Sequence, residues 1–224
     1  MKRKLLHLLW TILFPAVSLT AQEAKHVFVN MPDSILPLLT PINRADCIDF
    51  LESNMQALVK NRFDQMSEMT HLTGDYLSLS LSPQSTFELK LLPLNDSTRI
   101  ICTVQTVRSQ ACDSRIAFYT TGWEELPAAA HLPEIPQAAD FLPDSLSAAV
   151  ADTLSYSWES LRNEADILLM HATLADSTTT LTFTYTTPDY MRTESATRIR
   201  PLLKAASLHY DWTNGAFVRR KNEE

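Results

Sequence analysis

The chain has 224 residues, of which 45% are hydrophobic, 20% charged and 8% aromatic, and its formal net charge is −7. This composition is typical of a globular protein with a packed core and excludes a collagen-like or largely disordered chain. Its three glycines, Gly74, Gly122 and Gly215, cannot form a P-loop, a dinucleotide-binding fingerprint or a Gly-x-Ser-x-Gly nucleophile elbow. We therefore expect no cofactor. The acidic balance also argues against nucleic-acid binding, because it repels phosphates.

The N-terminus has the pattern of a signal peptide. Basic residues at positions 2–4 precede an apolar stretch at 5–17, and small and polar residues follow it. That stretch is too short to span a bilayer, and no apolar run of about 18 residues occurs later in the chain. We predict a signal peptide over residues 1–21, cleaved after Ala21, with cleavage after Thr20 as the alternative. The mature protein would have no transmembrane segment and would be exported to the periplasm or the cell surface.

The next segment, residues 22–123, has the pattern of a first α+β unit. Apolar residues at helical spacing over 44–61, including Cys47 and Leu51, predict an amphipathic helix capped by Asn43. Further along, apolar and polar residues alternate, which is typical of half-buried antiparallel strands. The strands expected from this alternation cover residues 76–82, 87–91, 100–107 and 116–120.

Residues 124–143 contain four prolines, too many for a helix or a central strand, so they are expected to form a linker. A second α+β unit is expected over residues 144–224. It would contain helical segments and two hairpins. The helical segments are expected within 144–161 and 190–204, and the hairpins around Ala175–Ser177 and Asn214–Gly215.

The two units share a Pro-Asp-Ser-aliphatic string, at residues 32–35 and 143–146, ahead of helical sequence. The predicted fold is α+β, with an antiparallel sheet of about eight strands and helices packed on one face. Two organisations remain open, namely two tandem helix-plus-four-strand units or one continuous domain. The first resembles the tandem-repeat β-lactamase-inhibitor fold, a resemblance that implies no inhibitory activity. Either organisation leaves one sheet face open to solvent.

Six strings carry a family resemblance: MPDSILPLL, NRADCIDFLESNMQ, LTGDYLSLSLS, LKLLPLNDST, CDSRIAFYTTGWEEL and LHYDWTNGAFV. They resemble an uncharacterised family of secreted Bacteroidetes proteins known as a domain of unknown function. The resemblance covers the mature chain and is densest from residue 31 to residue 126. It implies export and a Bacteroidetes lineage, and it assigns no catalytic or binding residue.

The chain has three cysteines, Cys47, Cys102 and Cys112, an odd number for an oxidising compartment. Cys47 lies on the apolar face of the predicted helix, which indicates a buried thiol. If the strands pair symmetrically about residues 109 and 110, Cys102 lies opposite residue 117 or 118, too far from Cys112 for a disulfide. A wider loop would permit the bridge, so the sequence leaves both states open.

The sequence contains few residues in patterns that point to catalysis or ligand binding. Glu68, His71, Asp75 and Tyr76 are close enough in sequence to form a general acid–base site, but no nucleophile accompanies them, so turn and cap polarity is the better explanation. The histidines are scattered, so we predict no catalytic, cofactor-binding or metal-binding residue. Large aromatic residues could contact a partner on the open sheet face, although most such residues are buried. The candidates are Tyr119, Trp123, Trp158, Tyr185, Tyr210 and Trp212.

Five Asp-Ser or Asp-Thr pairs are followed by Ile, Leu or Thr, a pattern that resembles the O-glycosylation signal of exported Bacteroidetes proteins. Asp-Ser is also common in turns and helix caps, which are exposed and therefore open to glycosylation. The predicted acceptors are Ser34, Ser97, Ser145, Thr153 and Ser177.

These observations favour an exported, non-enzymatic protein that binds a protein or glycan partner through an open sheet face. Two alternatives are a hydrolase or other enzyme with a site assembled from distant residues, and a structural component of the envelope. An enzyme would have a deep pocket around a His or a carboxylate, whereas a binding protein would have a shallow surface with aromatic residues.

Overall fold

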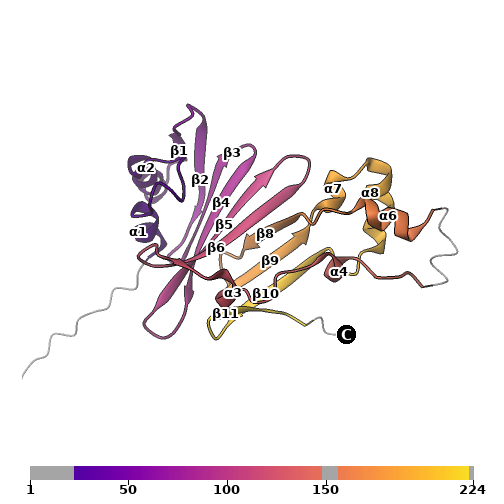
Figure 1. Ribbon diagram of the computed structural model, residues 1–224. Coiled ribbons are helices and arrows are strands. Elements are labelled where there is room, and N and C mark those ends of the chain that lie inside the picture. Colours follow the sequence, from indigo (N-terminus) through magenta and orange to yellow (C-terminus); the bar gives the residue numbers. More distant parts are fainter. Residues whose placement is uncertain (1–22, 148–155, 222–224) are drawn as a thin grey trace, which may run out of the picture.

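The computed structural model describes residues 23–147 and 156–221, which form two antiparallel sheets with short helices around them (Figure 1). In the larger sheet, seven strands lie side by side in sequence order. They are β1 (Ala57–Lys60), β2 (Met66–Leu72), β3 (Tyr76–Ser82), β4 (Ser85–Pro93), β5 (Arg99–Arg108), β6 (Cys112–Thr120) and β7 (Glu125–Leu126).

The smaller sheet has the order β11-β10-β9-β8. It contains β8 (Met170–Leu174), β9 (Thr180–Tyr185), β10 (Ser207–Thr213) and β11 (Ala216–Arg219). The helices α7 (Thr187–Tyr190), α8 (Thr193–Ile199) and η1 (Arg200–Leu202) connect β9 to β10. Asn214 and Gly215 both have positive φ, which suits the tight turn that joins β10 to β11. The hairpin predicted at this turn is confirmed.

The two faces of the larger sheet are covered differently. Helices α1 (Ala24–Val29) and α2 (Pro41–Glu52) pack on one face together with segment 31–39, and the smaller sheet packs against the opposite face (Figure 1). Residues 100–104 of β5 are therefore all buried, and all but Thr103 are apolar. The core on the helix side includes Phe28, Leu39, Leu79, Phe87 and Leu89, and the core between the sheets includes Val104, Phe118, Phe183, Tyr210 and Phe217.

The free edge of β8 is held by side chains of the larger sheet. The backbone N–H of Leu174 donates to Glu88 Oε2 at 2.7 Å, and that of Ala172 donates to Ser114 Oγ at 2.9 Å. An unpaired strand edge would otherwise leave buried N–H groups without acceptors. These polar contacts fix how the smaller sheet sits on the larger one.

The predicted α+β class with antiparallel strands and helices on one face is confirmed. The strands of the described residues number eleven in two sheets, however, where the sequence indicated about eight in one. The two predicted units share the core between the sheets, since Phe118 from one contacts Phe217 from the other. Their element orders also differ, because the first has six successive strands, with β7 in the predicted linker, and the second has two hairpins separated by helices.

Helix α2 is shorter than predicted and begins earlier. Thr40 caps it: the Asn43 N–H donates to Thr40 Oγ1, and the Asn43 side chain accepts from the Thr40 N–H, both at 3.1 Å. Pro41 occupies the first turn, where its missing N–H has no cost. A turn with Asn54 at positive φ ends the helical region, and Leu58, predicted to be helical, lies in β1.

The proline-rich segment 124–143 contains two short helices, α3 (Ala128–His131) and α4 (Ala138–Phe141). It also contributes Leu132 and Phe141 to the core between the sheets. Helix α6 (Trp158–Glu164) lies near the start of the second described range, residues 156–221. Within residues 23–147 and 156–221, no helix has the length and apolar character needed to cross a membrane.

Candidate functional site

A groove lies over β5 and β6 on the helix side of the larger sheet, next to the part that α1 and α2 cover. The strand register defines its floor: Thr103 pairs with Ala117, Gln105 with Arg115, and Tyr119 with Glu125 of β7. The cavity measures about 520 Å³, within the range of small-ligand sites. We call it the β5–β6 groove; its lining residues are Pro32, Ser34, Ile35, Pro37, Thr103, Gln105, Arg115, Ala117, Tyr119, Trp123 and Glu125.

Segment 32–37 forms one wall of the β5–β6 groove and is held at both ends. Gln105 Nε2 donates to the Ile35 carbonyl at 3.0 Å, which ties the wall to the floor. Behind the wall, Arg44 is 1% exposed and donates to the carbonyls of Met31 and Leu39 at 2.7 and 2.8 Å. Its guanidinium also contacts the Asp33 carboxylate at 3.2 Å. The wall is therefore preorganised by a buried cation.

The two aromatic residues of the groove are packed against each other. The rings of Tyr119 and Trp123 have centroids 5.3 Å apart, and both residues are less than a tenth exposed. Trp123 Nε1 donates to the Val27 carbonyl of α1 at 2.9 Å, and Trp123 has a φ of 69°. A bulky residue rarely adopts this conformation, and such strain concentrates at functional sites. The strained turn directs the indole ring back onto the sheet.

Arg115 and Glu125 supply the charge of the groove. Both are exposed, and neither side chain makes a hydrogen bond or an ion pair with the part of the chain that the structure describes. Most other arginines are paired, for example Arg219 with Asp140. Burial raises the pKa of the Tyr119 hydroxyl, the Glu125 carboxylate adds to this increase, and the Arg115 guanidinium opposes it. Two free charges of opposite sign thus flank the aromatic pair.

Comparisons with known proteins agree with this fold and give no activity. A family model described as a protein of unknown function, DUF3256, matches residues 16–217. The chain belongs to the DUF3256 family. One solved structure, a domain of an uncharacterized protein from Porphyromonas gingivalis W83, is similar with a TM-score of 0.75 and 25% identity, over 90% of this chain and 99% of the other. A comparison with curated proteins found no match.

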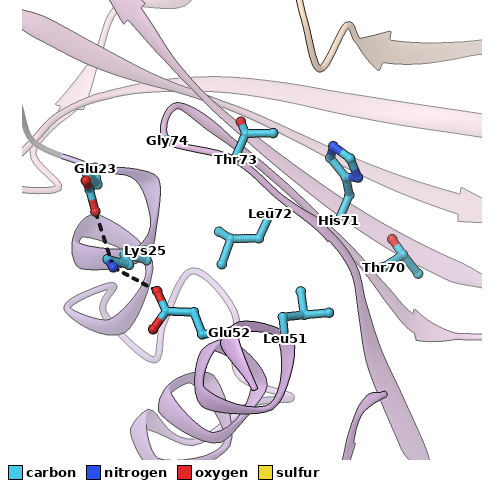
Figure 2. A pocket seen from close by; sticks show the side chains of 9 residues that line it. All are labelled: Glu23, Lys25, Leu51, Glu52, Thr70, His71, Leu72, Thr73 and Gly74. Atoms are coloured by element: carbon cyan, nitrogen blue, oxygen red, sulfur yellow. Dashed lines mark hydrogen bonds and ion pairs between the residues drawn. The ribbon is translucent and has the colours of Figure 1, made fainter. Parts of the chain in front are cut away.

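A second hollow of about 530 Å³ lies between the helices and the turn from β2 to β3. Figure 2 shows Lys25 between Glu23 and Glu52, with Leu51 and Leu72 beside them. The Lys25 ammonium lies 3.4 Å from the Glu23 carboxylate and 2.7 Å from the Glu52 carboxylate. Hydrogen bonds to both carboxylates raise the pKa of Lys25, and the bond to Glu52 has the larger effect. Because these charges already satisfy one another, this hollow is the weaker site of the DUF3256 chain.

Of the residues considered for acid–base chemistry, His71, Asp75 and Tyr76 lie close together: the rings of His71 and Tyr76 have centroids 5.9 Å apart, and the Lys90 ammonium lies 5.7 Å from the Tyr76 ring centroid. His71 lies 3.5 Å from Asp176, and Asp75 lies 3.1 Å from the buried Lys90 ammonium, which also donates to the Asp176 carbonyl. Glu68 instead accepts a hydrogen bond from Gln56. Lys90 was not predicted as a site residue, although a lysine amid the apolar residues of β4 was an available signal.

Glu88 is a half-buried titratable group that the sequence pattern did not reveal. It lies two residues from Lys90 on β4, and its carboxylate accepts the Leu174 N–H between the sheets. Burial raises the pKa of Glu88 to about 7, and this hydrogen bond partly opposes the increase. Neither it nor its neighbours form a metal site, because no group of three or more His, Cys, Asp or Glu in the described chain could hold an ion.

The other predicted partner-binding aromatics lie at or near the core between the sheets. Tyr185 and Tyr210 are 4% and 1% exposed, so neither can contact a partner in this conformation. They alternate with outward-facing threonines and His209, and the smaller sheet turns its apolar face inward against the larger one. Trp212 donates to the Pro93 carbonyl, and Trp158 packs at the periphery of the same core. Among these candidates in residues 23–147 and 156–221, Tyr119 and Trp123 line the β5–β6 groove.

The predicted glycosylation sites within the described residues are exposed in loops and turns. Ser34 lies on the wall of the β5–β6 groove, Ser97 in the turn from β4 to β5, and Ser177 in the turn from β8 to β9. Ser145 is also exposed, and Thr153 lies outside the described residues. Modification of these sites remains a prediction.

All three cysteines of this DUF3256 chain are free thiols. Cys102 pairs with Phe118 across the β5–β6 hairpin, as the symmetric register predicted, so a bridge to Cys112 is geometrically excluded. Burial raises the pKa of the Cys47 thiol to about 11, which suits the structural role predicted for it.

Proposed function

We propose that this DUF3256 protein is an exported, non-enzymatic binding protein and that its β5–β6 groove receives an extended segment of a partner protein. The observation that carries the proposal is the set of unused polar groups in the groove. Arg115 and Glu125 have no partner within the described chain, whereas the charges around the Figure 2 hollow are paired with one another. Free charges in a preformed groove are available to a ligand without breaking internal contacts.

The shape of the groove also supports binding. Its wall is fixed through Arg44 and Gln105, and its floor is a sheet, so the ligand would meet a rigid surface. Ala117 lies at the centre of the floor, where its short side chain leaves space between Arg115 and Tyr119. A protein segment is favoured over a neutral glycan because opposite charges lie at the two ends of the groove.

A photo-crosslinking experiment tests this function. A photoreactive amino acid replaces Ser34 on the groove wall, and a matched variant carries it at Ser97, which is exposed in a turn far along the sequence. Each protein is irradiated in an envelope extract of its native host, and adducts are identified by mass spectrometry. We expect a protein adduct from position 34 alone.

A groove-filling variant serves as the second control. Ala117→Trp places a large side chain on the floor and should abolish the adduct at position 34, while a circular dichroism spectrum shows that the fold is retained. A glycan adduct would assign the groove to a carbohydrate instead. An adduct that persists in Ala117→Trp, or an equal adduct at Ser97, would refute a role for the groove.

A further inference from the structure

The charges of the β5–β6 groove have a defined spacing. Arg115 and Tyr119 lie four residues apart on β6, and Glu125 lies directly across from Tyr119 on β7. A strand advances about 3.3 Å per residue, so the backbone positions of Arg115 and Glu125 are separated by about 13 Å along the strand direction. An extended ligand chain covers the same distance in about four residues.

The groups between the two charges are uncharged. Gln105 supplies a side-chain carbonyl whose amide N–H is already used, and Tyr119 and Trp123 supply an aromatic surface. Thr103 is 1% exposed and donates its hydroxyl to the Ala117 carbonyl, so it only completes the floor. The Gln105 carbonyl can accept a hydrogen bond from a peptide N–H, while the free guanidinium suits a carboxylate in a bidentate contact. Glu125 in turn favours a cation and repels an acidic group.

Building on the proposed function, we infer that the β5–β6 groove selects a zwitterionic peptide segment, with an acidic residue over Arg115 and a basic residue over Glu125, about four positions apart. A segment with two acidic or two basic residues at this spacing would place like charges together at one end. The sign pattern, rather than net charge, would therefore decide which segments bind.

Selection from a display library of random dodecapeptides tests this inference, with folded wild-type protein and Ala117→Trp as positive and blocked targets. Wild-type protein should enrich peptides that carry one acidic and one basic residue about four positions apart. Arg115→Glu should instead enrich peptides with two basic residues, and Glu125→Arg peptides with two acidic residues. The exchanged double variant should again enrich one acidic and one basic residue.

A charge-matched control separates the groove from the protein's overall charge. Arg99→Glu changes net charge as Arg115→Glu does, but Arg99 lies at the start of β5, outside the groove, so it should leave the selected pattern unchanged. For one synthetic peptide from the wild-type selection, we expect Arg115→Glu to weaken binding at least about fivefold in fluorescence anisotropy, against less than about twofold for Arg99→Glu.

The failures are distinguishable. Peptides that bind wild type, fail on Ala117→Trp and show no dependence on residues 115 and 125 would overturn the zwitterion inference and leave the groove as a binding site. A pattern that changes equally in Arg99→Glu would overturn the inference as a net-charge effect. If no peptide distinguishes wild type from Ala117→Trp, both the inference and the proposed peptide-binding function fail.

Discussion

Glu88 lies between the two sheets, and replacing it with Gln should remove a loss of stability that the wild-type protein undergoes as the pH rises. The native pKa of Glu88 is raised from 4.5 to about 7, so the native carboxyl keeps its proton to a higher pH than the unfolded chain does. Its contribution to stability is therefore full below pH 4.5 and is lost as the pH rises towards about 7. Each pKa unit corresponds to about 1.4 kcal/mol, and because Glu88 keeps some solvent contact we expect a loss of about 2–3 kcal/mol.

The Glu88→Gln side chain retains a carbonyl that can accept the Leu174 N–H and has no charge to bury. Its free energy of unfolding, measured by urea denaturation from pH 4.5 to 8, should therefore increase relative to wild type by about 2–3 kcal/mol across that range. The other titrating groups are common to both proteins, so the difference isolates Glu88. Glu159→Gln, at an exposed position on α6, is the matched control and should show a difference below about 0.5 kcal/mol. A Glu88→Gln difference that does not vary with pH would refute the reasoning.

Two further predictions concern the groove wall and export. Arg44→Met should lower the free energy of unfolding by about 2–4 kcal/mol, because the carbonyls of Met31 and Leu39 lose their donor in a buried site. The control is Arg62→Met at an exposed position, which should lower it by less than about 1 kcal/mol. Equal losses in the two variants would show that the burial of Arg44 is unimportant. Protein purified from a Bacteroidetes host should lack residues 1–21. Its intact mass should exceed that of the same mature chain made in a foreign cytosol. Equal masses would show that the predicted acceptor residues serve only as caps and turns. Replacing the predicted acceptor residues with Ala one after another should remove this excess mass stepwise. These residues are Ser34, Ser97, Ser145, Thr153 and Ser177.

Local patterns predicted most strands because their side-chain alternation does not depend on distant partners. The serines between Leu77, Leu79 and Leu81 indicated β3, and the Asn214–Gly215 pair indicated the last hairpin. The helix over 44–61 was overextended for the same reason: apolar residues at helical spacing continue through Leu58, and only the capping by Thr40 and the turn at Asn54 set the actual limits.

Only some residues of the candidate site could be predicted from the sequence. Tyr119 and Trp123 were among the aromatic candidates, but periodicity could not separate them from Tyr185 and Tyr210, which are equally large and lie on similar alternating strands. Arg115 and Glu125 were missed, although polar residues at Thr103 and Arg115 on a face that is otherwise apolar could have marked the uncovered part of the sheet.

The α+β class, the antiparallel strands and the absence of glycine-rich catalytic motifs follow from local sequence, because propensity, alternation and turn chemistry act within a few residues. How the strands divide into two sheets depends on contacts such as Glu88 with Leu174, between residues far apart in the chain. The groove likewise exists only because segment 32–37, held by Arg44 and Gln105, stands beside β5 and β6 without covering them. Which side of a strand faces another layer is a property of packing between elements, and no single strand encodes it.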